Sequence, residues 1–159
     1  AVGKQIFLNV APDKAYNAGG KKALINGISG NDKRYGDKEW LGFSGEDLEI
    51  TINFDTPTEI NNISTRFYNG NGQWIYAPKT FNLELKLENG KIISSKNSIK
   101  NTGNLLVSFN LNISQWYPEN EILKSTQLKI TIPNYGVIEE GKQGAGHKAW
   151  TFIDEIIVE

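Results

Sequence analysis

The sequence contains no cysteine and no methionine, and only one histidine and five prolines among its 159 residues. Without cysteine, disulfide bonds, thiol catalysis and zinc–thiolate centres are excluded. A single histidine, His147, excludes metal centres built from several imidazoles. No apolar run reaches the ~20 residues that a membrane-spanning helix needs, so no membrane span is expected.

The chain also lacks an excess of charge of either sign. It carries 17 Lys and Arg against 18 Asp and Glu, a formal net charge of -1. Domains that bind nucleic acid normally carry a basic excess with clustered cations, so no nucleic-acid partner is expected. The length suits one domain, and no linker, internal repeat or low-complexity tract divides it. We therefore predict a single domain over residues 1–159.

The dominant hydrophobic period is two, which is typical of strands with one buried face. Leu48, Ile50, Ile52 and Phe54 alternate with polar residues. Further strands are predicted at residues 5–10, 60–67, 81–87, 92–94, 105–111, 128–132 and 150–158. Asn89-Gly90 is a two-residue hairpin signal, and only Lys21–Ile25 could form a short helical turn. About eight strands joined by turns rich in glycine and asparagine predict an all-β, antiparallel β-sandwich.

The sequence offers little catalytic chemistry. An acid–base mechanism needs partnered groups, but His147 lies in a glycine-rich stretch with no carboxylate beside it in sequence. Most carboxylates fall on the polar side of strands, where a solvated face explains them. A pair of glycosidase carboxylates stays open as an alternative, but no pair stands out.

Residues 26–47 form a long segment with no strand pattern, rich in glycine and oxygen-bearing side chains. Loops of this length in compact domains are usually functional or held by a ligand. Calcium takes six to eight oxygen ligands, many from backbone carbonyls, so the segment could hold this ion. An ordinary turn rich in asparagine and aspartate is the alternative.

The aromatic residues divide into two groups. Trp40, Phe43, Trp150 and Phe152 lie in apolar contexts and are predicted to be mostly buried. The others lie in or beside polar loops, where their rings could stack on the apolar face of a sugar or simply anchor the loops. They are Tyr35, Tyr68, Trp74, Tyr76, Trp116, Tyr117 and Tyr135.

Five segments occur in an order found in one known group of domains: AYNAGGKKALING (15–27), EWLGF (39–43), DLEITINF (47–54), WIYAP (74–78) and GAGHKAWTFIDEIIV (144–158). In these segments the chain resembles the discoidin-like (coagulation-factor type C, or F5/8 type C) domains of the galactose-binding-like fold. It is most similar to family-32 carbohydrate-binding modules appended to bacterial glycoside hydrolases, notably β-hexosaminidases. The resemblance covers nearly the whole chain and implies a jelly-roll β-sandwich with its two ends close together.

The resemblance also implies a structural calcium ion. In many members it lies between an early Asp-Gly loop and a glutamate of the final strand. The matching positions here are Asn26 and Glu155, with backbone carbonyls near Ile25, Ile28, Lys38 and Asp154 as further ligands. Asn26 stands where aspartate is commoner, which removes one anionic ligand and weakens the expected site.

Family members bind sugars through variable loops at one end of the sandwich. We expect the loop over residues 66–76 to supply Arg66, Tyr68, Asn69, Asn71, Trp74 and Tyr76, with Tyr35 and His147 from neighbouring loops. The resemblance implies a monomeric, non-catalytic module that holds a parent hydrolase on glycans containing galactose or N-acetylhexosamine. It also implies a bacterial protein that is secreted, periplasmic or on the cell surface. The alternative is a protein–protein or structural module that keeps the fold without binding sugar.

Overall fold

The computed structural model describes residues 1–17, 19–113 and 124–159. Trp116 and Tyr117, two of the predicted loop aromatics, lie outside these residues. Within the described residues there are ten strands: β1 (Gln5–Leu8), β2 (Leu41–Ser44), β3 (Leu48–Glu59), β4 (Asn62–Tyr68), β5 (Thr80–Leu87), β6 (Ile92–Ser98), β7 (Leu106–Asn112), β8 (Lys124–Ile132), β9 (Trp150–Ile153) and β10 (Ile157–Val158). In the described part of the chain, three short 3-10 turns accompany them: η1 (Lys14–Tyr16), η2 (Lys21–Ile25) and η3 (Asn71–Gln73).

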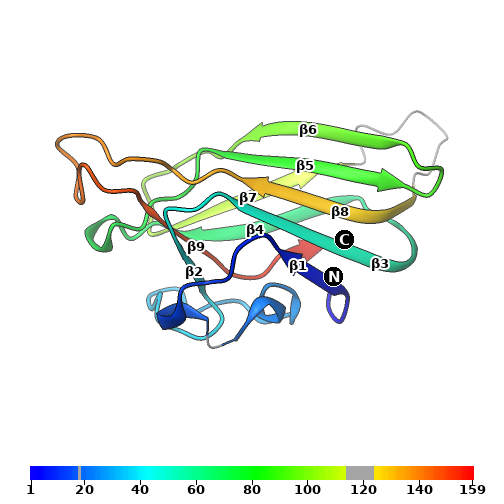
Figure 1. Cartoon of the computed structure of the whole chain (residues 1–159), viewed down its shortest axis with the longest axis horizontal. Coiled ribbons are helices and arrows are strands. Elements are labelled where there is room, and N and C mark those ends of the chain that lie inside the picture. The colour runs from blue at the N-terminus through cyan, green and yellow to red at the C-terminus, as the bar shows by residue number, and fades with distance from the viewer. Residues whose placement is uncertain (18, 114–123) are drawn as a thin grey trace.

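The strands form two antiparallel sheets that face each other (Figure 1). One sheet has the order β1-β3-β8-β5-β6, and the other has the order β10-β4-β9-β2 with β7 paired to β4. The predicted all-β sandwich and the predicted turn at η2 are both confirmed. The termini lie near each other, as the resemblance implied (Figure 1).

Two details differ from the sequence prediction. The segment 26–47 is not without strands, because β2 occupies its last part and pairs with β9. Gly42 in β2 allows this pairing, since a Cβ there would come within 2.6 Å of the Phe152 ring opposite. The predicted strand over residues 150–158 is two strands, because its pairing is interrupted between Ile153 and Ile157.

The alternating residues pack between the sheets. Ile50, Ile52, Leu128 and Ile130 in the first sheet are fully buried, as are the inward residues of β4. The rings of Phe81 and Phe109 stack with centroids 4.3 Å apart across the interior. Because each buried aliphatic side chain contributes about 1.5–3 kcal/mol, this two-sided core stabilises the fold without disulfide bonds.

A second, aromatic cluster fills one end of the sandwich. Trp40 is 1% exposed there, as predicted, and its indole N–H donates to the Asn31 carbonyl over 2.8 Å. Trp150 is half-buried beside Phe152, with the Tyr16 ring packed edge-on against it at 5.5 Å. Among the described residues, no helix is long and apolar enough to cross a membrane.

Candidate functional site

Two loops project together from one end of the sandwich: the turn around η3 and the long loop between β8 and β9, drawn in orange in Figure 1. Backbone hydrogen bonds dock them on each other. The Trp150 N–H donates to the Trp74 carbonyl (2.9 Å), and the Tyr76 N–H donates to the Trp150 carbonyl (3.1 Å). The Tyr76 hydroxyl donates to the Gln143 carbonyl (2.7 Å), so the projecting end has a defined shape.

Trp74 follows η3 in the left-handed conformation, with φ 64° and ψ 22°. Among the described residues it is the one non-glycine residue with positive φ. Such a conformation costs a non-glycine residue about 1–2 kcal/mol, and it occurs preferentially at functional sites. The local bond from the Trp74 N–H to the Asn71 carbonyl (3.0 Å) closes the turn.

The turn presents the indole to solvent, where it stacks on His147. The two rings are 4.5 Å apart at an interplanar angle of 17°, Trp74 is 39% exposed, and His147 is exposed as well. Gly144 lies against the indole, since a Cβ there would come 2.6 Å from the Trp74 Cγ. Asn71 and Gln73 are exposed on the same turn. The result is a partly exposed aromatic surface made of two stacked rings, with exposed amide groups on the turn that carries the indole.

Three other residues predicted to bind sugar are buried instead. The Tyr68 hydroxyl donates to the Lys33 carbonyl (3.2 Å), and its ring packs on Trp40. Asn69 is 6% exposed, and its side-chain oxygen accepts from the Ala77 N–H (3.1 Å). Tyr76 is 3% exposed. These side chains support the loops from beneath, because their polar atoms are used on the chain itself.

Arg66 also points away from the aromatic surface. Its Nε and Nη2 donate to Oδ2 of Asp154 over 2.9 and 2.6 Å, and its Nη1 donates to Asp32 over 2.8 Å. The Asp154 side chain is 1% exposed, and this burial raises the pKa of its carboxyl while the pairing with Arg66 opposes the rise. Arg66 is therefore a structural ion-pair partner. Tyr35 is half-buried, edge-on against Tyr68.

The structure brings the two predicted calcium positions together. The Gly27 N–H donates to Oε1 of Glu155 over 3.0 Å. The Asn26 side chain uses both of its polar atoms within the chain: its oxygen accepts from the Ile28 N–H (2.9 Å), and its nitrogen donates to Glu39 (2.6 Å). With one lone pair of its oxygen used in this way, Asn26 is a weaker candidate for the role of a calcium ligand.

Glu155 and Asp154 fit that role better. Oε2 of Glu155 and Oδ1 of Asp154 are both buried without a hydrogen-bond partner, and both residues line a small cavity of about 200 Å³ with Ser29 and Thr65. Burial raises the pKa of the Glu155 carboxyl, because removal from water penalises its charged form. The described residues contain no cluster of three or more His, Cys, Asp or Glu side chains suited to a metal. Backbone and hydroxyl oxygens would have to complete the coordination.

The other predicted helpers, named for their backbone carbonyls, are not among the residues that line this cavity. The Ile25 side chain is in the hydrophobic core. Ile28 is exposed, and its N–H is taken by Asn26. The Lys38 carbonyl lies against Gly19, where a Cβ would come within 2.6 Å of the oxygen. Sequence reasoning found Glu155 through its family position but did not predict the Asp154 side chain, whose pairing with Arg66 depends on tertiary structure.

Three solved structures with the same fold are carbohydrate-binding modules. A family 32 module from Clostridium perfringens NanJ in complex with galactose matches with 11% identity over 98% of this chain and 92% of that chain, at a TM-score of 0.57. The family 32 module of Streptococcus pneumoniae EndoD matches with 11% identity over 99% and 96%, at 0.58. A C. perfringens module, CpGH89CBM32-5, in complex with GalNAc-β-1,3-galactose, matches with 13% identity over 98% and 94%, at 0.55.

No protein-family model matches the sequence, and no curated protein matches it significantly. The structural similarity extends over nearly the full length of both chains in each comparison. At 11–13% identity it establishes the fold and leaves the binding residues to be argued from this chain. The chain has the galactose-binding-like β-sandwich fold of discoidin-like domains, in the form found in family 32 carbohydrate-binding modules.

Proposed function

We propose that the chain is a non-catalytic carbohydrate-binding module that binds glycans containing galactose or N-acetylhexosamine. The observation that carries this proposal is the exposed Trp74 ring, held in a left-handed turn and stacked on His147. A strained backbone that holds an apolar ring in solvent has no benefit for folding, which favours a binding role. The three similar modules described above support the carbohydrate class.

The surface suits a sugar ring for physical reasons. The flat C–H face of a pyranose packs on an aromatic plane, and neighbouring amides exchange hydrogen bonds with its hydroxyls. The exposed part of the stacked Trp74 and His147 rings supplies the aromatic contact, and Asn71 and Gln73 supply the amides. Tyr68, Asn69 and Tyr76 support the loops from beneath, whereas Arg66 is paired with Asp154.

A single exposed platform gives weak binding, because ordering costs offset most of the contact energy. We expect a Kd of about 0.1–1 mM, equivalent to about -5.5 to -4 kcal/mol. Retention on a glycan surface would then require several sugar units or a linked catalytic domain. We accordingly place the chain as the targeting module of a glycoside hydrolase, such as a β-hexosaminidase. In this proposal the full-length protein is bacterial and is secreted, periplasmic or on the cell surface.

Structural calcium belongs to the same proposal. The two unpartnered buried oxygens of Asp154 and Glu155 would provide the anionic ligands. The ion would then stabilise the domain where the last strands meet the loop around Asn26, and it would take no part in sugar binding.

The test is titration of the chain with galactose, N-acetylgalactosamine and N-acetylglucosamine, followed by NMR or calorimetry. Trp74→Ala and His147→Ala should each remove binding with a change in Tm of only a few degrees. Ile92→Ala is a matched control, because Ile92 is also a large exposed apolar side chain (55%) but lies in β6, outside both loops. If none of the sugars perturbs Trp74 at tens of millimolar, about a hundredfold above the tight end of the expected Kd range, the module does not bind these sugars. A role as a protein-interaction module would then replace the proposal.

A further inference from the structure

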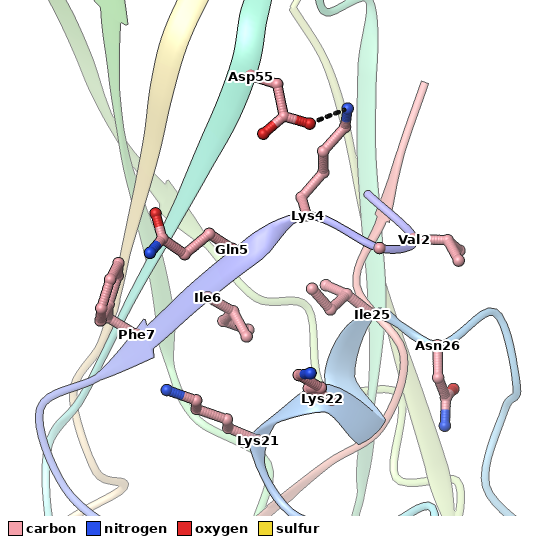
Figure 2. A pocket seen from close by; sticks show the side chains of 11 residues that line it. Val2, Lys4, Gln5, Ile6, Phe7, Lys21, Lys22, Ile25, Asn26 and Asp55 are labelled. Atoms are coloured by element: carbon pink, nitrogen blue, oxygen red, sulfur yellow. Dashed lines mark hydrogen bonds and ion pairs between the residues drawn. The ribbon is translucent and has the colours of Figure 1, made fainter.

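A second hollow lies away from the Trp74–His147 surface, between the edge strand β1 and η2 (Figure 2). This groove has a volume of about 720 Å³, within the ~300–1,000 Å³ range of small-molecule sites. Ile6 and Ile25, each 2% exposed, lie at its base. The groove therefore has an apolar base and a mixed lining, beside a strand that has a sheet neighbour on one side only.

Its rim is cationic. Lys4, Lys21 and Lys22 line the groove against a single acid, Asp55, and Figure 2 shows all of them around the strand. Lys4 pairs with Asp55 over 3.3 Å. Neither Lys21 nor Lys22 forms an ion pair within the part of the chain that the structure describes, so the rim carries an excess of two positive charges. In a chain whose overall charge is -1, this is a local concentration of positive potential.

An exposed aromatic ring stands beside these cations. Phe7 is 45% exposed at the end of β1, and Nζ of Lys21 lies 5.3 Å from the centre of its ring. Gln5 adds an amide group to the lining. An apolar ring, an ammonium group and an amide side by side match a sugar that carries a carboxylate. The C–H groups of the sugar would contact the ring, its carboxylate would pair with the ammonium group, and its hydroxyls would form hydrogen bonds with the amide.

We propose that this groove is a second glycan site, selective for an acidic saccharide such as a hexuronate oligomer. Lys21 and Lys22 bind the carboxylates, and Phe7 contacts the apolar side of the sugar. The site is independent of the neutral-sugar surface around Trp74, so it can be present whether or not that surface binds sugar. An acidic peptide paired along the open edge of β1 is the competing occupant, and the experiment below separates the two.

The experiment compares trigalacturonate with its neutral counterpart galactotriose, which differs only in the carboxylates. Binding to the whole chain is measured by calorimetry in 50 mM NaCl. We expect trigalacturonate to bind at least about tenfold more tightly than galactotriose, a difference of about 1.4 kcal/mol. The affinity should fall as NaCl is raised to 500 mM, because the contacts are ionic and near the surface. Equal binding of both trisaccharides would overturn the proposal.

Variants locate the site. The double variant Lys21→Gln/Lys22→Gln should lose about tenfold in affinity for trigalacturonate, and Phe7→Ala should lose several-fold. Lys86→Gln/Lys100→Gln is the control, because both residues are exposed outside the groove and their loss changes the net charge equally. Equal losses in the two double variants would show non-specific attraction and overturn the proposal. Triglutamate that competes as well as trigalacturonate would assign the groove to an acidic peptide instead.

Substitutions in one site should not affect binding at the other. Trp74→Ala should leave trigalacturonate binding unchanged. Loss of trigalacturonate binding in Trp74→Ala, with full binding in Lys21→Gln/Lys22→Gln, would show one shared site at the loop end and overturn the proposal for the groove.

Discussion

The ion pair between Arg66 and Asp154 gives the sharpest test of the reassignment of Arg66. The perturbation is Arg66→Met, which keeps the length and much of the apolar stem but removes the guanidinium. Asp154, 1% exposed, would then lose its two bonds from Arg66 and keep backbone bonds such as that from the Gly30 N–H at 3.1 Å. A buried carboxylate without a counter-charge is strongly destabilising, because the low-dielectric interior does not replace the lost interaction.

The expected loss is about 3 kcal/mol in the free energy of unfolding, at the low end of the measured range because Arg66 is itself 24% exposed. For a chain of this length, that corresponds to a fall in Tm of about 6–12 °C. Urea unfolding followed by fluorescence measures the free energy, and differential scanning calorimetry measures Tm.

Two controls define the result. Arg34→Met removes an exposed arginine and should change the stability by less than about 0.5 kcal/mol. Asp32→Asn removes the charge of the other partner of Arg66. Because the Asp32 side chain is 71% exposed, this change should lower the free energy of unfolding by less than about 1 kcal/mol. If Arg66→Met is as stable as Arg34→Met and instead abolishes sugar binding, Arg66 is a binding residue and the structural role is wrong.

Three further predictions concern other regions. Trp40→Ala should cost about 3–5 kcal/mol in urea unfolding, because a fully buried ring is lost from the aromatic cluster; a loss below about 1 kcal/mol would contradict its core role. EDTA should lower the Tm and excess calcium restore it, since a ligand of the folded state stabilises that state; Glu155→Gln should abolish the response, and a wild-type chain insensitive to both would contradict calcium binding. The Tyr135 hydroxyl lowers the pKa of Glu139 from 4.5 to about 2, so this interaction should stabilise the fold above about pH 4.5 and be lost as pH falls towards 2. NMR titration of Tyr135→Phe should return the Glu139 pKa towards 4.5, and an unchanged value would refute the assigned cause.

Much of the fold could be predicted from the sequence. The alternation of Leu48, Ile50 and Ile52 determines both that β3 is a strand and which face it buries, because side chains alternate across a strand. Composition alone excludes thiol chemistry, since cysteine is absent, and the balanced charge disfavours nucleic-acid binding. The strand β2 was missed because its pattern is too short to be recognised without its partner β9.

Only the tertiary structure divided the loop residues into those that face solvent and those that hold the loops. Tyr68, Trp74 and Tyr76 are close in sequence and similar in chemistry, yet Trp74 is exposed while the other two are buried. That difference depends on which carbonyls and rings other parts of the chain, such as the loop between β8 and β9, place near each side chain. The local sequence does not indicate these contacts. Likewise, the charge on Arg66 suits a sugar or a carboxylate equally well until the fold places it against Asp154, 88 residues away. The sequence by itself determined the sandwich, and long-range contacts decided which side chains remain free to bind.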